Sequence, residues 1–260
     1  MNYQIDYTAA SCRGSRRSNQ DNLCVGAELP WIDPAEDFSA RGTLETRKTQ
    51  IFCVCDGVGG ESFGDVASLL CLEQVMQVSA QHPQMPLKEL LQEAAERANS
   101  SVKAFFRKLG QRGGCTMTIL AVRNDSFAFL NLGDSPAFLL RRGEEMEPVL
   151  TELSYRHNLK WEKLRNGEMP GPRDSGYLLR YIGDPVRPAA AQAYITEGVL
   201  CSGDALLLCS DGVTNQMDNR ILQLALESGT DARILVNRAA EAPNSDNATA
   251  ICLQIRPMIP

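Results

Sequence analysis

Four aspartates stand where predicted strands begin or end, and their side chains have the chemistry to bind a cation. Two of them close hydrophobic runs, in FCVCDG (52–57) and LLLCSDG (206–212). A single Asp-Gly pair would indicate only a turn. Two such pairs at the ends of hydrophobic runs indicate more than turns, because a carboxylate beside a buried strand is costly unless a positive charge compensates it. The four residues are Asp21, Asp56, Asp211 and Asp246.

These aspartates predict a site for a hard divalent metal. Carboxylates and backbone carbonyls, with no His or Cys at a suitable spacing, are the ligands that suit magnesium or manganese. Gly57 follows Asp56, and a glycine there lets the backbone carbonyl approach an ion closely. Two ions about 4 Å apart that share one carboxylate would activate a water and hold a phosphoryl group for in-line attack. The chemistry expected from these residues is therefore metal-dependent hydrolysis.

The composition is that of a globular protein that binds neither nucleic acids nor membranes. The chain has 260 residues, of which 43% are hydrophobic and 22% are charged. Its net charge of -6 argues against nucleic-acid binding, because phosphate contacts need clustered Lys and Arg. The first residues show no signal-peptide pattern, and no apolar run approaches the ~20 residues of a membrane span. We therefore expect a cytoplasmic protein.

The nine cysteines are an odd number, and most of them lie inside apolar runs. They are expected to be buried small hydrophobic residues in a reducing compartment. Cys53 and Cys55 lack the two intervening residues of a zinc knuckle, so we expect no metal role for this pair.

Alternating and helical patterns predict the elements that must position the aspartates. A pair of strands is expected at 3–9 and 22–28, and the polar segment 30–49 is expected to be an excursion outside the core. Consecutive antiparallel strands, separated by the turns RND and GDS, are predicted at 115–122, 126–134 and 136–145. Further strands are predicted at 51–55, 204–212 and 247–255, and helices at 64–80, 86–109, 216–226 and 231–241. This order indicates α+β layers around an antiparallel sheet core, with a long irregular segment at 151–190.

Seven motifs extend the two strand-end patterns along nearly the whole chain. They are GSRRSNQDN (14–22), DGVGGESFGDVAS (56–68), GGCTMTILAV (113–122), NLGDSPAFLLRRG (131–143), YLLRYIG (177–183), SGDALLLCSDG (202–212) and SDNATAICL (245–253). In this order they resemble the motifs of the metal-dependent protein phosphatases of the protein phosphatase 2C family, bacterial type. The resemblance implies a four-layer sandwich of two antiparallel β-sheets flanked by helix pairs. It also implies a single catalytic domain over residues 1–260, with a flap-like segment at about 151–185.

The resemblance assigns a role to each candidate site residue. Asp56 matches the ligand that bridges two divalent cations, and the Gly57 carbonyl matches a ligand of one of them. Asp211 and Asp246 match the ligands of the other cation, and Asp21 matches the acidic residue that holds metal-bound water. The cations are expected to be Mn²⁺ or Mg²⁺.

The same resemblance assigns a phosphate-binding arginine. Arg16 matches it by its distance from the aspartate that follows, and Arg17 is the alternative by its distance from the preceding glycine. A guanidinium suits a phosphate dianion because it donates two parallel hydrogen bonds. Thr116 is expected to be a buried strand residue without a catalytic part, and Asn247 to support the ligand beside it.

Several positions depart from the family pattern. Gln20 replaces a glutamate, Glu61 replaces a histidine and Asp65 replaces a glutamate. At the third metal position Asp134 is present, but Asn215 stands where an aspartate is usual. Because one carboxylate is lost there, we expect two sound metal sites and a weak third site at Asp134.

The expected function is a metal-dependent protein serine/threonine phosphatase that uses water as the nucleophile. Its partners would be phosphorylated proteins, opposing a serine/threonine kinase, and the chain is expected to be a monomer. Two alternatives stay open: a catalytically weak binding or sensing module, suggested by Gln20, Glu61 and Asn215, and a small-molecule phosphatase. Substrate choice is expected to lie in 151–185, whose Arg and Lys residues would meet acidic or phosphorylated partners or form a solvated loop. Neither His82 nor His157 has the spacing of a catalyst.

Overall fold

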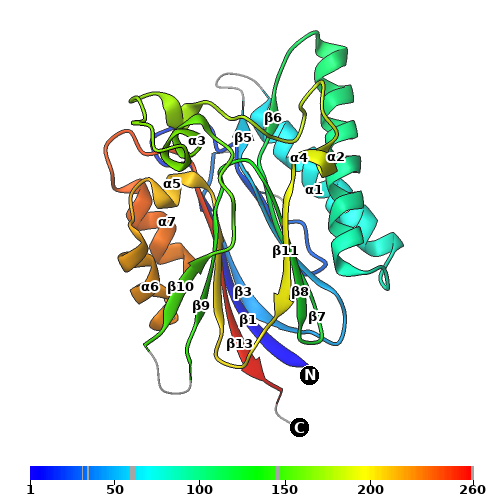
Figure 1. The fold of residues 1–260 in the computed structure, drawn as a ribbon, viewed down its shortest axis with the longest axis vertical. Coiled ribbons are helices and arrows are strands. Elements are labelled where there is room, and N and C mark those ends of the chain that lie inside the picture. The colour runs from blue at the N-terminus through cyan, green and yellow to red at the C-terminus, as the bar shows by residue number, and fades with distance from the viewer. Residues whose placement is uncertain (31, 34, 59–62, 144–146, 259–260) are drawn as a thin grey trace.

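Two antiparallel β-sheets face each other in the centre of the molecule (Figure 1). The computed structural model describes residues 1–30, 32–33, 35–58, 63–143 and 147–258. The six-stranded sheet contains, in spatial order, β10 (Val149–Glu152), β9 (Ala137–Arg141), β12 (Ala205–Cys209), β13 (Ala248–Pro257), β1 (Tyr3–Cys12) and β3 (Phe38–Glu45). The five-stranded sheet contains β11 (Tyr194–Val199), β8 (Ser126–Leu132), β7 (Met117–Arg123), β4 (Gln50–Cys55) and β2 (Asn22–Val25). A separate two-stranded ribbon is formed by β5 (Gly57–Val58) and β6 (Gly114–Cys115).

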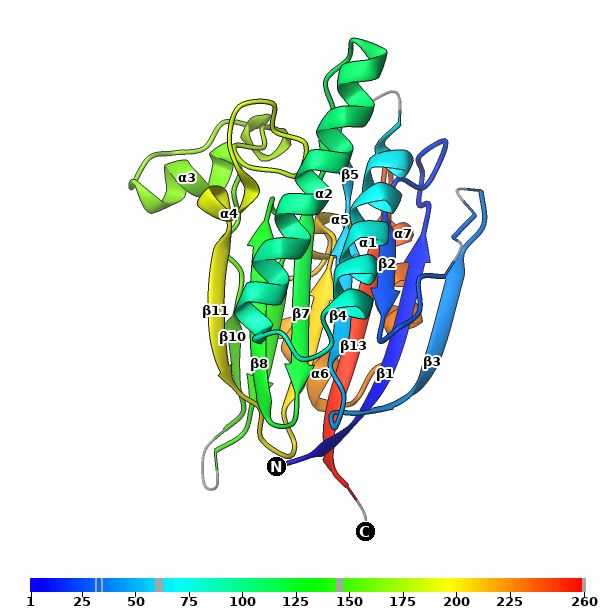
Figure 2. The ribbon, with the colours of Figure 1, turned by 90° about the vertical axis from the view of Figure 1, so that its right-hand side faces the viewer.

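Helices cover the outer face of each sheet, which gives the molecule four layers (Figures 1 and 2). The five-stranded sheet is covered by α1 (Gly64–Gln81) and α2 (Leu87–Leu109). The six-stranded sheet is covered by α6 (Asn219–Glu227) and α7 (Ala232–Ala240). The α+β architecture expected from the sequence, two antiparallel sheets flanked by helix pairs, is confirmed.

Three hydrophobic cores fill the spaces between these layers. Strand β12 shows how one strand serves two of them: Leu206 and Leu208 point into the core between the sheets, while Leu207 points toward α6 and α7. Because both faces of this strand are covered, its sequence is a continuous apolar run in which polar residues do not alternate. Eight of the nine cysteines are buried, as expected, and Cys201 is exposed.

The prediction for 30–49 was wrong in one respect, since this polar segment contributes strand β3. It pairs with β1 along the edge of the six-stranded sheet, with Ala9 opposite Ala40. Most of its side chains are exposed. An edge strand that buries little apolar surface needs no hydrophobic pattern, and the sequence signal for it is accordingly weak.

Two expected strand pairs were also wrong, because their strands lie in different sheets. β1 joins the six-stranded sheet, whereas β2 pairs with β4 in the five-stranded one. β7 and β8 form the expected hairpin, but the chain then crosses the sandwich and β9 pairs with β12. The segment GDS is therefore a crossing between sheets, with Gly133 at a φ of 107°.

The segment expected to be irregular does contain little regular structure. It holds α3 (Leu159–Arg165), a 3-10 turn at Asp174–Gly176 and α4 (Ala189–Gln192), and β10 and β11 border it. It lies at the end of the sandwich that also carries β5 and α5 (Asp211–Thr214), opposite the two termini (Figures 1 and 2). Within the described ranges, no helix is both long and apolar enough to cross a membrane.

Candidate metal centre

One cleft collects most of the aspartates that the sequence singled out. It has a volume of about 840 Å³ and lies where the strands of both sheets end beside α5 and the ribbon β5–β6. Both candidate arginines also line it. The predicted residues brought together here are Arg16, Arg17, Asp56, Gly57, Asp134, Asp211 and Asp246.

The glycines beside two of these aspartates are required by close packing. A Cβ on Gly57 would lie 2.4 Å from the carbonyl oxygen of Gly64, in the first turn of α1. A Cβ on Gly212 would lie 2.0 Å from the carbonyl oxygen of Asn247. Both distances are far below contact distance, so each Asp-Gly pair marks a place where two backbones meet at the floor of the site.

Asp21 lies behind the cleft and is 1% exposed. Its Oδ2 accepts a hydrogen bond from the Ser210 hydroxyl at 2.8 Å, while its Oδ1 is buried with no protein partner. A buried carboxylate oxygen without a donor is costly unless a cation, a water or a proton satisfies it. This orphaned oxygen is compatible with the role expected for Asp21 beside metal-bound water.

Burial and mutual repulsion make this group of carboxylates difficult to ionise. Burial, with added repulsion from Asp21 and Asp211, raises the pKa of Asp56 well above its ordinary value. Burial raises the pKa of Asp21 to about 7, and burial with the charge of Asp211 raises that of Asp134 to about 7. The pKa of Asp211 is raised by burial and by Asp246. Such a set is favourable only when protons or metal ions balance the charge.

The carboxylates surround the cleft without collapsing onto one another. In the part of the chain that the structure describes, no three of them place oxygens within 4.8 Å of one another. The three ligand atoms that do lie so close are the sulfurs of Cys55, Cys71 and Cys115, in the core under α1. The donor set of the cleft itself is all oxygen, which suits magnesium or manganese and offers nothing to a soft metal.

Arg16 and Arg17 lie at the mouth of the cleft, on the loop before β2. The Arg16 guanidinium donates to Oδ2 of Asp246 at 2.6 Å, and its side chain is 55% exposed. The loop is held by Asn247, whose amide donates to the carbonyl oxygens of Arg13 (2.8 Å) and Ser18 (3.0 Å). Asn247 therefore fixes the arginine loop, and only its backbone N–H supports Asp246.

Amide side chains satisfy the carboxylates at the third metal position. Asn158 donates to Oδ2 of Asp134 at 2.8 Å, and Asn215 donates to Oδ2 of Asp211 at 3.2 Å. These neutral amides stabilise the two carboxylates by hydrogen bonds and supply no net positive charge. The weak third site at Asp134 stays a prediction.

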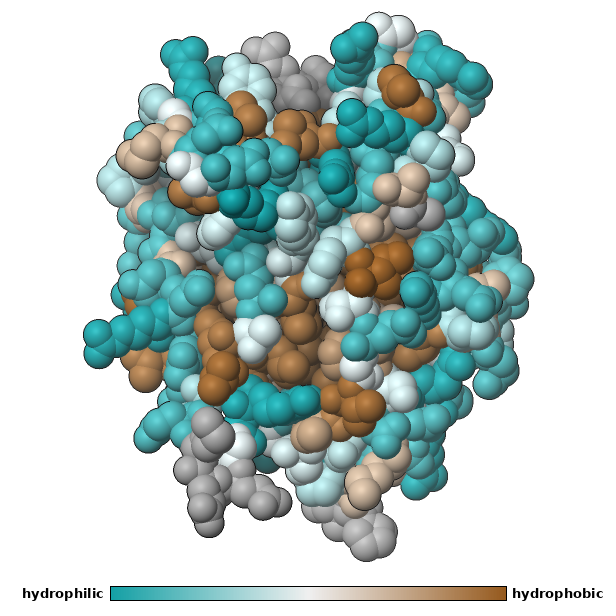
Figure 3. Space-filling model, in the orientation of Figure 1, coloured by the Kyte–Doolittle hydropathy of each residue, from teal (hydrophilic) through white to brown (hydrophobic). Residues whose placement is uncertain are grey.

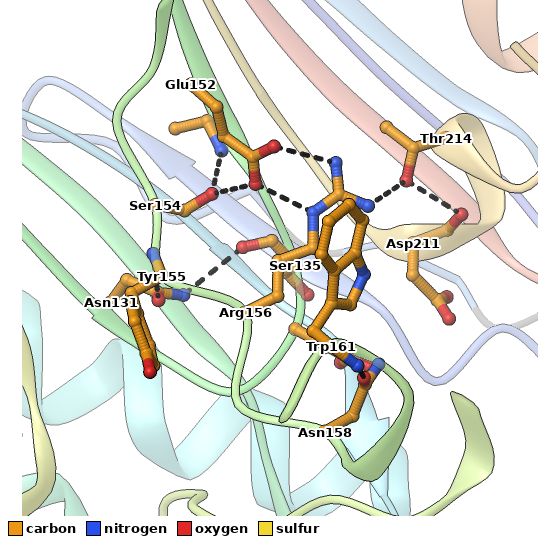
Figure 4. Close-up of polar contacts among 12 residues, drawn as sticks. Asn131, Ser135, Glu152, Ser154, Tyr155, Arg156, Asn158, Trp161, Asp211 and Thr214 are labelled. Atoms are coloured by element: carbon orange, nitrogen blue, oxygen red, sulfur yellow. Dashed lines mark hydrogen bonds and ion pairs between the residues drawn. The ribbon is translucent and has the colours of Figure 1, made fainter. Parts of the chain in front are cut away.

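A partly buried arginine that the sequence did not single out stands next to this position (Figure 4). Arg156 donates to Glu152 at 2.7 and 3.2 Å and to the Thr214 hydroxyl at 3.4 Å, and Trp161 stacks on it at 4.7 Å. Its charge lowers the pKa of both Asp134 and Asp211. Arg156 thus supplies fixed positive charge and ties α3 to α5.

Thr116 has a larger part than its sequence position suggested. Its hydroxyl accepts from the backbone N–H of Asp56 at 2.9 Å, and its own N–H donates to the Asp56 carbonyl at 2.8 Å. The same hydroxyl lies 2.7 Å from that of Ser135. Thr116 therefore positions Asp56, and a threonine two residues beyond a glycine pair gives no sequence signal for that contact.

Gln20 lines the metal cleft, whereas the remaining candidates lie away from it or outside the described residues. His157 is 2% exposed, with Nδ1 near the Gly133 backbone, and burial lowers its pKa to about 4. His157 does not line the metal cleft, and the expectation that neither histidine is a catalyst stays a prediction. Asp65 begins α1, and Gln20 packs against Gly64. Glu61 falls outside the described residues.

Comparison with known proteins agrees with this geometry. The family described as Protein phosphatase 2C matches residues 5–163. The "Serine/threonine phosphatase stp" of Listeria monocytogenes serotype 4b is 26% identical over 230 residues, which is 82% of this chain and 88% of that protein. The "Serine/threonine protein phosphatase PstP" of Mycobacterium tuberculosis H37Rv is 24% identical over 96% of this chain, which spans 45% of PstP.

The fold is also that of solved structures. The catalytic domain of PstP, crystallised in complex with two manganese ions, superposes with a TM-score of 0.76 at 24% identity and covers 98% of this chain and 100% of that one. PppA, described as a key regulatory component of the type VI secretion system in Pseudomonas aeruginosa, gives a TM-score of 0.75 at 23% identity, with 98% of this chain and 100% of that one covered.

Proposed function

This chain belongs to the protein phosphatase 2C family, and from that premise we propose that it is a metal-dependent phosphatase for phosphoserine and phosphothreonine in proteins. One observation carries the proposal: four aspartates from distant parts of the chain line one cleft, with Asp21 buried behind it and two arginines at its mouth. Its substrates would be phosphoproteins made by a serine/threonine kinase. The curated relatives, described as serine/threonine phosphatases, support this substrate class.

The residues that would hold two divalent cations are Asp56, the Gly57 carbonyl, Asp211 and Asp246, with Asp21 behind them. When bound, the cations supply an activated water as nucleophile and positive charge for the phosphoryl oxygens. Thr116 holds Asp56 in place through its two hydrogen bonds. The Arg16 guanidinium, now on Asp246, would be free to bind phosphate once a cation engages that carboxylate.

The basic test is hydrolysis of an aryl phosphate and of phosphothreonine peptides by the purified protein, with and without Mn²⁺. Manganese-stimulated release of phosphate from both is expected. A protein that binds metal but hydrolyses neither would instead be a binding or sensing module. Turnover of small phosphates with no activity on phosphopeptides would indicate the small-molecule phosphatase.

Replacing Arg16 by Ala is expected to lower kcat/KM for the aryl phosphate on the order of 10- to 100-fold, because a charge-assisted phosphate contact is lost. Replacing the neighbouring Arg17 by Ala is the matched control. It should change kcat/KM less than about 3-fold, because an exposed charge that does not contact the phosphate contributes little. Steady-state kinetics at saturating Mn²⁺ measures both. The reverse ranking would assign the phosphate contact to Arg17.

Replacing Asn215 by Asp is expected to strengthen a third metal site on the order of 10-fold, since it adds a carboxylate beside Asp211 and removes an amide donor. Isothermal titration calorimetry with Mn²⁺ would show a weak third event in the wild-type protein and a tighter one in the variant. Asn166→Asp, at the end of α3, is the control for added charge. A wild-type third site as tight as the first two would contradict the prediction.

A further inference from the structure

Half of the six Lys and Arg residues of the flap are less available to a partner than its sequence suggests. Three of them are engaged inside the flap: Arg156 with Glu152, Lys163 with Asp174 at 2.9 Å and Arg165 with Glu162 at 3.2 Å. An acidic partner would have to displace these carboxylates. Recognition of acidic groups must therefore be sought among cations without an internal partner.

Such cations line a second cavity, which is separate from the metal cleft. It has a volume of about 640 Å³ and lies between the end of α2 and residues 181–185. Lys103, Arg107 and Arg112 contribute its charge, and the rings of Phe106 and Tyr181 contribute apolar wall. In Figure 3 the surface at the free end of α2, at the upper right, is largely hydrophilic.

Among the residues that the structure describes, no carboxylate forms an ion pair with these three cations. Within the same described ranges, no Asp or Glu lines the cavity. The nearby Asp184 is buried, and its Oδ1 already accepts from the backbone N–H groups of Val186 (2.8 Å) and Arg187 (3.1 Å). This concentration of unbalanced charge is unusual in a chain whose net charge is -6.

Stabilisation of α2 does not account for the cluster. A cation in the last turn of a helix interacts favourably with the helix dipole, and that explanation covers Arg107. Lys103 lies one turn earlier, and Arg112 lies beyond Gly110, where the helix has ended. Two of the three cations therefore have no helical role, although all three face the same cavity.

The cavity is a near neighbour of the metal cleft. Val58 lines the cleft and pairs with Gly114 across the ribbon, and the adjacent Gly113 lines the cavity. Paired strands lie about 4.8 Å apart, and an extended chain advances about 3.3 Å per residue. A few residues of extended peptide are therefore enough to reach from one site to the other.

We propose that this cavity, lined by Lys103, Arg107 and Arg112, binds acidic side chains that flank the phosphorylated residue of a protein substrate. The proposal rests on the proposed phosphatase function and adds a substrate class to it: phosphoproteins whose phosphosite is followed or preceded, within a few residues, by Asp or Glu. Recognition is electrostatic, with the rings of Phe106 and Tyr181 contacting the methylene groups of the bound side chains.

The test compares phosphothreonine peptides that differ in a single Glu or Gln, scanned through six positions on each side. At low salt, wild-type kcat/KM is expected to rise about 10-fold for the best Glu position, and this preference should fall as salt is added. The charge reversals Lys103→Glu, Arg107→Glu and Arg112→Glu, singly and together, should remove it. Arg233→Glu, an exposed change on α7, should retain it.

Two further readouts separate the possible results. Hydrolysis of an aryl phosphate, which cannot reach the cavity, should be unchanged in the charge-reversal variants, and its absence in the wild type would count against the proposed function itself. Anisotropy of a labelled acidic, unphosphorylated peptide in EDTA measures the cavity without metal ions, and the three reversals should weaken binding about 10-fold. An active wild-type enzyme without a Glu preference, or equal peptide binding by wild type and the triple variant, would overturn the inference.

Discussion

Replacing Asp56 by Asn is expected to lower kcat for phosphopeptides and for an aryl phosphate by roughly 1000-fold or more, because both cations would lose a shared charged ligand. The amide retains the size of the side chain, and Thr116 contacts only the backbone of this residue. The fold should therefore persist. Steady-state kinetics with Mn²⁺ measures the loss of turnover, and calorimetry measures the number of metal ions bound.

Asp65→Asn is the matched control, since this aspartate begins α1 and does not line the cleft. It should leave kcat within about 3-fold of wild type, as expected of a residue away from the site. In the absence of metal, Asp56→Asn should raise the free energy of unfolding, because it removes a buried carboxyl group whose ionisation the folded state disfavours. A variant that binds two metals normally and keeps its activity would refute the assigned role of Asp56.

The metal-free protein is expected to become less stable as the pH rises from about 4 to about 7. Asp21 and Asp134 have folded-state pKa values raised to about 7, whereas an unfolded Asp titrates near 3.8. The folded state therefore holds more protons than the unfolded state in this window, and its free energy of unfolding falls as those protons leave. The raised pKa values of Asp56 and Asp211 act in the same direction. His157, whose pKa is lowered to about 4, opposes them as a single group.

Manganese should remove this loss of stability at higher pH, since bound cations compensate the carboxylates that have lost their protons. Urea unfolding at pH 5 and pH 7.5, in EDTA and in MnCl₂, measures the free energy of unfolding under each condition. In EDTA the free energy of unfolding should be lower at pH 7.5 by a few kcal/mol or more. In MnCl₂ the protein should be at least as stable at pH 7.5 as at pH 5.

Asp21→Asn provides the control for this experiment. It removes one buried titrating group, so the pH dependence in EDTA should become shallower while the unfolding transition stays cooperative. A metal-free protein that is more stable at pH 7.5 than at pH 5 would show that these carboxylates are ionised and compensated without metal.

Much of the fold was predictable where local pattern and burial agree. The helices at α1 and α2 follow from a continuous apolar stripe, and β4 and β12 follow from short apolar runs that end in Asp-Gly. These signals are local, because the residues that define them are neighbours in the sequence. The order of the motifs was enough to identify the family and the layered architecture.

Sheet membership was not predictable in the same way. The step from β8 to β9 looks like a hairpin in the sequence, yet it crosses the sandwich at Gly133. Strand β3 has no apolar pattern because it lies at a sheet edge. Which sheet a strand joins depends on which partners remain unpaired in the whole molecule, and no window of sequence contains that information.

The sequence by itself determined the chemistry expected of this protein: which aspartates gather at and behind the cleft, that their oxygen donors suit hard cations, and that arginines stand near them. Only the tertiary structure decided the environment of those groups. Thr116 holds Asp56 from the link between β6 and β7, and Arg156 supplies charge beside Asp211 from the flap. The cations at the end of α2 meet residues 181–185 across a cavity. The physical reason is that residue type sets what a side chain can do, whereas burial, charge balance and distance are set by contacts between residues far apart in the chain.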